Sequence, residues 1–205
     1  MSDSNGWAAI DRALWDLYRQ DAPFHVGTEH PFRLGGPDPL DGISVYPRES
    51  PIPHWHYVGF GMSELYEKES PNSELSGWGF EFTIRAAGVP DGSPPPMWPA
   101  RLLQQLGRYV FDSGKWFEPG HTMRVSAGID PSRPDSAIRG ITFIEDPELG
   151  AIGTPHGRVL FLQVVGITGD EFEAATGGRV GELLTRVGSR LPVFVTDTAR
   201  GSLIG

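Results

Sequence analysis

The sequence predicts an α+β fold in which helices pack on a mixed, largely antiparallel β-sheet. Apolar residues alternate with small or polar ones along residues 76–85, which is typical of a strand with one face on the core. Apolar residues at steps of three and four predict amphipathic helices near residues 6–19 and 99–113. The run from Val159 to Leu162 is apolar on both faces, as in a central strand. Helices should therefore cover at least part of the second face of the sheet.

The first expected element is a helix over residues 6–19. Asn5 can accept a hydrogen bond from a free amide in the first turn of this helix. One apolar stripe is formed by Trp7, Ile10, Leu14 and Leu17. The next segment, residues 23–53, is rich in proline and in Gly-Pro and Asp-Gly pairs, which favour turns. It predicts a surface segment with only a brief strand around residues 43–46.

Extended structure is expected to resume at His54 and to return in the strand over residues 76–85. The core face of the second strand consists of Trp78, Phe80, Phe82 and Ile84, and its other face of Gly79, Glu81, Thr83 and Arg85. Pro99 lies just inside the start of the second helix and Gly114 just past its end, which are the favoured positions of these residues.

The C-terminal part alternates strands with short helices. Further strands are expected over residues 121–127, 138–144 and 158–167. Thr168 and Glu171 have the spacing of a capping box that begins a short helix. Another helix is expected over residues 180–187, before a last strand over residues 193–196.

Length and charge limit the classes of function. The chain has 205 residues, of which 39% are hydrophobic, and we expect one domain over residues 1–205 with its core at about 6–203. Seventeen basic and 26 acidic side chains give a net charge of -9, which disfavours direct binding of nucleic acid. The apolar runs are far shorter than the roughly 20 residues that span a bilayer. No association with a membrane is expected.

The chain has no cysteine, which excludes disulfides, thiolate nucleophiles and sulfur-ligated zinc. Its N-terminal segment lacks the basic and apolar regions of an export signal, so a cytoplasmic location is expected. Ser63 lacks the flanking glycine of a nucleophile elbow. Glu145 and Asp146 precede Pro147 and are interpreted as a solvated turn. We therefore expect no cofactor and no catalytic residues.

Segments dense in aromatic residues and glycine carry a family resemblance. They are PHWHYVGFGMSELY at residues 53–66, SGWGFEFTIR at 76–85 and WPARLLQQLGRYVFDSG at 98–114. The series continues with EDP at 145–147, TPHGRVLFLQVVGI at 154–167 and TDTARG at 196–201. In this order and spacing, the sequence resembles the N-terminal domain of the Suppressor of fused family over roughly residues 6–203.

The resemblance implies a non-enzymatic protein that binds and restrains a partner protein. In animals the family holds a Gli-type transcription factor in the cytoplasm by gripping an extended peptide between this domain and a second, C-terminal domain. The sequence ends at Gly205, soon after TDTARG, so the second domain is expected to be missing or much shorter. This form resembles the bacterial members, which implies a role as an immunity protein against a toxin.

The resemblance also nominates residues that bind the partner. The family's peptide-contacting tyrosine ends an LSDLY motif, and it corresponds to Tyr66 of MSELY, with Glu64 in place of the aspartate. An aspartate that contacts the peptide before the family's SGFGFE motif falls near Ser73 or Glu74. The polar loop over residues 66–76 is thus the candidate binding surface.

A rival hypothesis is a metal-dependent enzyme or small-molecule binder centred on His54 and His56. Two histidines two residues apart on a strand share a face and could hold a metal ion if His25, His30 or Glu64 supplied a third ligand. The favoured interpretation is that both histidines are hydrogen-bonded inside the packed domain. A third possibility is a purely structural subunit, which a large exposed apolar patch would support.

Overall fold

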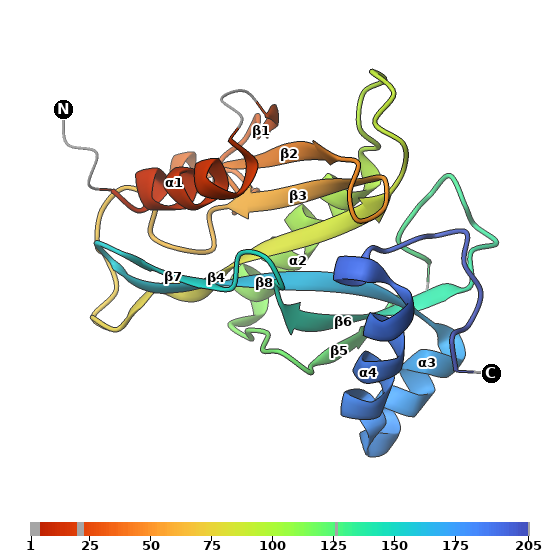
Figure 1. The fold of residues 1–205 in the computed structure, drawn as a ribbon. Coiled ribbons are helices and arrows are strands. Elements are labelled where there is room, and N and C mark those ends of the chain that lie inside the picture. The colour runs from red at the N-terminus through yellow and green to blue at the C-terminus, as the bar shows by residue number, and fades with distance from the viewer. Residues whose placement is uncertain (1–4, 20–22, 126, 205) are drawn as a thin grey trace.

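The computed structural model describes residues 5–19, 23–125 and 127–204, and its centre is one twisted eight-stranded sheet (Figure 1). The strand order is β1-β2-β3-β4-β8-β6-β5, with β7 paired to β8. The β4–β8 pair is parallel and the other pairs described are antiparallel, which confirms the predicted class. The strands are β1 (Phe24–Gly27), β2 (Gly42–Arg48), β3 (His54–Phe60), β4 (Leu75–Ala87), β5 (Thr122–Arg124), β6 (Ile138–Glu145), β7 (Ala151–Thr154) and β8 (Gly157–Thr168). The α-helices are α1 (Gly6–Tyr18), α2 (Trp98–Ser113), α3 (Gly169–Ala174) and α4 (Val180–Arg190).

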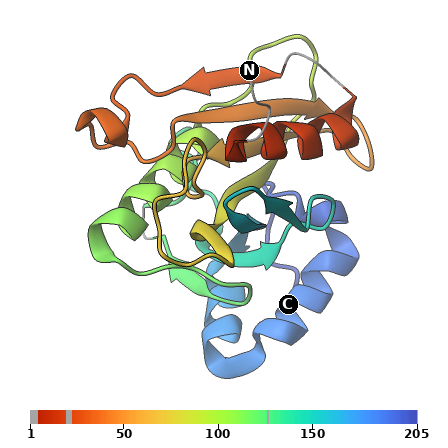
Figure 2. The same ribbon diagram turned by 90° about the vertical axis from the view of Figure 1, so that its left-hand side faces the viewer.

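The helices cover both faces of the sheet, as the sequence predicts. Helix α2 packs on one face, and α1 and the α3–α4 pair lie on the other (Figure 2). The side chains of β8 show the division. Leu162 and Val164 belong to the core under α2, Phe161 to the core under α1, and Val165 to the core under α3 and α4. Gln163 points to the second face between the two helical covers, and it is fully buried.

The predicted helix ends are confirmed. The side chain of Asn5 accepts a hydrogen bond from the amide of Ala8 (2.9 Å), and α1 begins at the next residue. Gly114 ends α2 in the left-handed conformation (φ 68°), which glycine adopts without a steric penalty. Glu171 accepts a hydrogen bond from the amide of Thr168 (2.9 Å), as the capping box requires.

The proline-rich segment forms more structure than the sequence predicts. Besides β2, which extends the expected strand around residues 43–46, the chain forms the edge strand β1 against it. The prolines at positions 23 and 31 flank β1 without interrupting its ladder, so they do not prevent pairing. The short strand β7, which forms a hairpin with β8, was also not predicted.

Two predicted strands were wrong in extent or type. The strand expected over residues 121–127 is limited to β5, and Ser126 lies outside the described residues. The strand expected over residues 193–196 is a 3-10 turn in which Val193 and Phe194 have positive φ. Their carbonyls accept hydrogen bonds from Gln163 Nε2 (3.0 and 3.2 Å), which fixes the turn. A single parallel bridge joins Thr196 to β4.

Among the described residues, the longest helices are too short and too polar to cross a bilayer.

Candidate functional site

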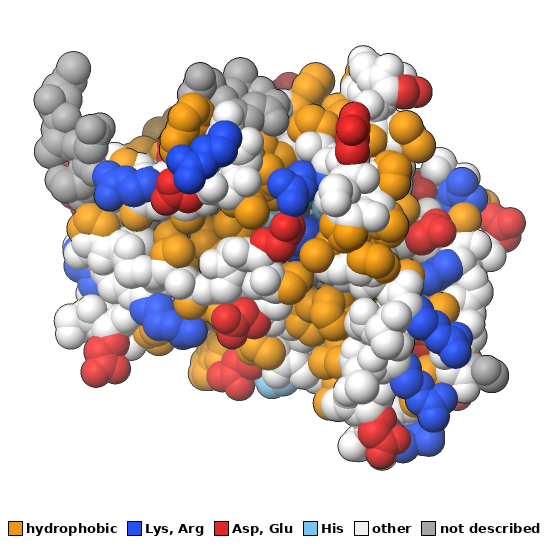
Figure 3. Space-filling model, viewed as in Figure 1, with side chains coloured by type: hydrophobic (Ala, Val, Ile, Leu, Met, Phe, Trp, Pro, Cys, Tyr) orange, Lys and Arg blue, Asp and Glu red, His pale blue; other side chains and the backbone are white. Residues whose placement is uncertain are grey.

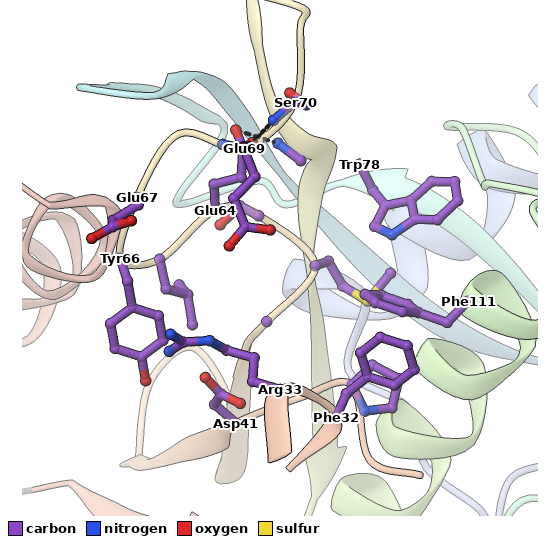
Figure 4. Close-up of a pocket in the computed structure, with 16 residues that line it drawn as sticks. Phe32, Arg33, Asp41, Glu64, Tyr66, Glu67, Glu69, Ser70, Trp78 and Phe111 are labelled. Carbon is purple, nitrogen blue, oxygen red and sulfur yellow. Dashed lines mark hydrogen bonds between the residues drawn. The ribbon is translucent and has the colours of Figure 1, made fainter. Parts of the chain in front are cut away.

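A surface groove of about 510 Å³ lies beside Tyr66, the residue that the family resemblance nominates (Figure 4). Its walls come from four separate parts of the chain. They are the connection between β3 and β4, residues 61–74, the segment around Phe32 to Asp41, the start of β4 with Trp78, and Phe111 of α2. The lining residues include Phe32, Arg33, Asp41, Glu64, Tyr66, Glu67, Glu69, Ser70, Trp78 and Phe111.

Glu64 shapes the wall of the groove, and its carboxylate is turned towards the β3–β4 connection. Its carboxylate accepts hydrogen bonds from Lys68 Nζ (2.7 Å) and from the amides of Glu69 (2.7 Å), Gly77 (3.0 Å) and Ser70. Burial opposes ionisation of this carboxylate, but these hydrogen bonds lower its pKa to about 2. Glu64 is thereby ionised at neutral pH and fastens both ends of the connection.

Tyr66 forms one end of the groove and remains 41% exposed. The guanidinium of Arg33 lies over the Tyr66 ring, 4.0 Å from its centroid, which is a cation–π contact. Burial and a hydrogen bond with Asp41 raise the pKa of Tyr66. The exposed edge of this ring is therefore held in one orientation by groups on the opposite wall.

Three aromatic rings form the other end of the groove. Phe111 meets Phe32 edge-to-face (4.9 Å between centroids) and Trp78 at a tilt (5.7 Å). Phe32 is 49% exposed although it belongs to this cluster. Figure 4 shows the three rings in a row along one side of the groove, with Glu69 on the facing side. We call Phe32, Trp78 and Phe111 the aromatic wall.

Ser73 and Glu74, the other residues that the resemblance nominates, lie on the same connection but do not line the groove. Both are exposed. The amide of Glu74 donates to the side chain of Asn72 (2.9 Å), and its carbonyl accepts from the amide of Arg158 (2.8 Å). The structure therefore brings Tyr66 and Glu64 together at the groove and places Ser73 and Glu74 farther along the loop.

The groove also contains residues that the sequence did not nominate, namely Phe32, Arg33, Asp41 and Phe111. Phe32 and Arg33 lie in the proline-rich segment that the sequence predicts as a surface segment, more than 30 residues before Tyr66. The sequence carries no local signal that the segment and the connection meet. Phe111 is the exception, because its position does leave a signal in the sequence. It is an aromatic residue outside the apolar stripe of its helix, as expected of a side chain at a surface site.

Glu81 supports the groove from inside the protein. This fully buried residue of β4 accepts hydrogen bonds from the amides of Gly61 (3.0 Å), Met62 (3.1 Å) and Ser63 (2.9 Å) and from Ser63 Oγ (2.6 Å). Burial raises the pKa of Glu81 to about 7, against the lowering effect of these hydrogen bonds. One buried side chain thus fixes the backbone that begins the connection.

The histidines of the rival hypothesis are fully buried on the second face of the sheet. Nδ1 of His54 is 2.7 Å from the carbonyl of Ile52, and Nδ1 of His56 is bonded to the hydroxyl of Tyr18. The Nε2 of His56 lies 3.1 Å from the Asp146 carboxylate. Each histidine is thus hydrogen-bonded through its Nδ1 inside the packed domain.

The centre of this region is Arg85, which is fully buried on the polar face of β4. Its guanidinium donates two hydrogen bonds to Asp146 (2.7 and 3.0 Å), one to Glu148 (2.8 Å) and one to Gln163. Asp146 also accepts from Thr83 Oγ1 (2.8 Å). We define Tyr18, His56, Thr83, Arg85, Asp146, Glu148 and Gln163 as the arginine cluster. In Figure 3, basic and acidic side chains meet in the gap between the orange surfaces over α1 and α4.

The interpretation of Asp146 as part of a solvated turn was wrong. Asp146 is 1% exposed, and the amides of Glu148 and Leu149 donate to it (3.0 Å each) as the chain turns after β6. Burial opposes its ionisation, but the contacts with His56 and Arg85 hold its pKa well below its usual value. Asp146, which the sequence presents as part of a turn, is therefore the anion that neutralises Arg85.

The proposed third metal ligands do not join these histidines. Glu64 binds Lys68 and the connection, and His25 on β1 hydrogen-bonds Ser44 (3.2 Å) and packs near Trp7. A cation bound at His56 and Asp146 would meet the guanidinium of Arg85 on the same carboxylate. Over residues 5–19, 23–125 and 127–204, no three or more His, Cys, Asp or Glu side chains are grouped to hold a metal ion.

Comparison with known proteins yields one family. The family model described as Suppressor of fused protein (SUFU) matches residues 36–201. The Suppressor of fused homologs of Homo sapiens and Mus musculus are each 38% identical over 199 residues, which is 90% of this chain and 41% of theirs. The chain thus spans about two fifths of the length of these curated relatives.

Solved structures agree in fold. The chain in the Sufu-Fu complex crystal structure superposes with a TM-score of 0.90 at 33% identity, covering 97% of this chain and 92% of that one. The crystal structure of Drosophila Suppressor of Fused gives a TM-score of 0.89 at 32% identity over 98% of this chain and 51% of that one. The resemblance read from the sequence is confirmed, and the chain belongs to the Suppressor of fused family.

Proposed function

We propose that this chain is a non-enzymatic protein-binding module that sequesters or inhibits a partner protein through the groove beside Tyr66. The observation that carries the proposal is a groove lined by four aromatic side chains, two of which are open to solvent, with Tyr66 41% and Phe32 49% exposed. Exposed aromatic anchors in a concave site are typical of protein interfaces. Family membership supports the same function, because one related structure is a complex of Sufu with Fu.

In this proposal the nominated residues have different roles. Tyr66 contacts the partner directly, and Glu64 keeps the connection in shape from behind. Ser73 and Glu74 extend the contact along the exposed loop. The buried imidazoles of His54 and His56 contribute to the fold and take no part in binding.

The finer proposal is that the chain is a cytoplasmic immunity protein and that its partner is a toxin. The net charge of -9 supports a basic partner, such as a nuclease domain, because opposite charges accelerate encounter. Knowing the neighbouring genes would nominate the toxin to be tested.

The test is affinity capture with the wild-type chain and with Tyr66→Ala. We expect one protein to be captured by the wild type and its affinity to fall at least tenfold in the variant, as for an interface hot spot. Tyr109→Ala is the matched control, because Tyr109 is 38% exposed on α2 and does not line the groove. Equal capture by all three proteins would place the binding surface elsewhere, and no capture at all would refute the proposed function.

A further inference from the structure

The geometry points to the chemistry of the partner: the groove takes a lysine or arginine side chain that projects from the surface of the partner protein. This inference rests on the proposed function and names what the groove recognises. It requires an apolar surface for the side-chain stem and a negative environment for the cationic head.

The aromatic wall supplies the first requirement. Phe111 lies between Phe32 and Trp78, so the three rings form a continuous apolar side of the groove. Aromatic faces attract ammonium and guanidinium groups through the negative charge density of the ring face. The contact between Arg33 and Tyr66 is the same type of interaction at the opposite end. Because Arg33 is already engaged with Tyr66, it leaves the aromatic wall open.

The acidic residues supply the second requirement. Four carboxylates line the groove, from Asp41, Glu64, Glu67 and Glu69, against the one guanidinium of Arg33. The carboxylate of Glu64 is already occupied by hydrogen bonds within the connection, and that of Asp41 is hydrogen-bonded to Tyr66.

Glu69 is the acidic residue best placed to meet a cation. Figure 4 shows its carboxylate pointing from the connection into the groove, whereas Glu67 points outward beyond Tyr66. Among the hydrogen bonds and ion pairs of the described residues, none engages the side chain of Glu69. The backbone amide of Glu69 donates to Glu64, which holds the backbone from which the Glu69 side chain projects.

The charge balance decides between possible occupants. An acidic partner side chain would meet four carboxylates, balanced only by Arg33 and by Lys68, which pairs with Glu64, so an excess of two negative charges would repel it. A purely apolar side chain would contact the rings but would leave the carboxylate of Glu69 without a cationic partner. A basic side chain satisfies both walls, and the net charge of -9 attracts such a segment from a distance.

The test uses capped Gly-Lys-Gly and its norleucine and glutamate counterparts as probes of the full chain. The chain has four methionines, and Met62 lines the groove while Met97 does not. With methyl-labelled methionine, we expect the lysine peptide to shift the Met62 signal saturably and to leave Met97 unchanged. The lysine peptide should bind about fivefold more tightly than the norleucine peptide, and the glutamate peptide should not bind.

Glu69→Gln should reduce the preference for lysine over norleucine to less than twofold. Glu49→Gln is the control, because Glu49 is exposed and lies outside the groove, and its replacement removes the same charge. Equal binding of the lysine and norleucine peptides, or equal effects of the two variants, would overturn the inference. If Tyr66→Ala abolishes partner capture while the lysine peptide fails to bind, the proposed function stands and this inference fails.

Discussion

Arg85 is the residue on which the interior most depends. It is fully buried with Asp146, and the pair is bidentate. A buried ion pair adds little net stability compared with apolar residues, but removing one partner leaves a charge that the interior cannot solvate. The arginine cluster fills the space between α1 and α4, where neither helix supplies an apolar cover.

Asp146→Asn should therefore destabilise the protein by about 3–5 kcal/mol, because Arg85 would keep its charge and lose the anion that neutralises it. Urea denaturation would measure the change in the free energy of unfolding. Glu148→Gln is the matched control, since Glu148 also bonds Arg85 but its side chain is 21% exposed. We expect a cost of about 1 kcal/mol or less for that variant, and similar costs for both would contradict this account.

His56 should make stability depend on pH. Burial and the nearby charge of Arg85 lower the pKa of His56 from 6.5 to about 4 in the folded state. Folding thus favours the neutral imidazole, so its contribution is complete above pH 6.5 and is lost as the pH falls towards 4. The loss corresponds to about 3 kcal/mol.

The measurement compares the free energy of unfolding of the wild type and of His56→Gln between pH 7 and pH 4. The difference between the two proteins isolates His56 from Glu81, whose raised pKa acts in the opposite direction over this range. His121→Gln is the control, because His121 lies at the surface with a half-exposed side chain. A wild-type profile parallel to that of His56→Gln would refute the prediction.

At the scale of elements, the β3–β4 connection is an ordered structure despite its polar sequence. Glu64 binds the amides of Glu69 and Gly77, and Glu81 binds the amides that begin the connection. Gly77 has φ 55°, and a Cβ at this position would lie 2.7 Å from the carbonyl oxygen of Met62. Glycine at this position lets the connection close against the sheet.

Glu64→Gln should loosen the connection without unfolding the domain. Charge-assisted hydrogen bonds contribute about 1.5–3 kcal/mol each, so amide exchange at Glu69, Ser70 and Gly77 should accelerate at least tenfold. Hydrogen exchange resolved by residue would measure this. Glu67→Gln is the neighbouring control, because Glu67 lies on the same connection and its replacement removes the same charge, but the amides of Glu69 and Gly77 donate to Glu64. Unchanged protection in Glu64→Gln would show that the connection is held by other contacts.

At the scale of the molecule, the two faces of the sheet have separate roles. The face under α2 carries the largest apolar core, and the aromatic wall continues from that core to the surface through Phe111 and Trp78. The other face contains the arginine cluster between its two helical covers. The proposed binding groove and the arginine cluster are therefore located on opposite sides of β4.

The overall negative charge predicts that association with the partner depends on salt. The rate of association of the protein captured through Tyr66 should fall by about tenfold between low and high salt, while dissociation changes less. Stopped-flow mixing over a salt series would measure it. An association rate that does not vary with salt would exclude electrostatic attraction and, with it, a basic partner.

The sequence alone determined the elements whose signals are local. The periodicity of residues 6–18 and 98–113, their capping residues, and the apolar strands β4, β6 and β8 follow from contacts within one helix or along one strand. The resemblance supplied the family and located Tyr66. Strands β1 and β7 escaped prediction because a short edge strand has little apolar pattern of its own.

Only the tertiary structure decided the two clusters that matter most. Arg85 and Asp146 are 61 residues apart, and Arg33 and Tyr66 belong to separate segments that meet at the groove. In the sequence, the polar face of β4 looks like a solvent face, and Asp146 looks like a turn. The partners of these residues are set by the register of strands that are distant in the chain and by the gap between two helices. Neither the register nor the gap can be predicted from the local sequence pattern.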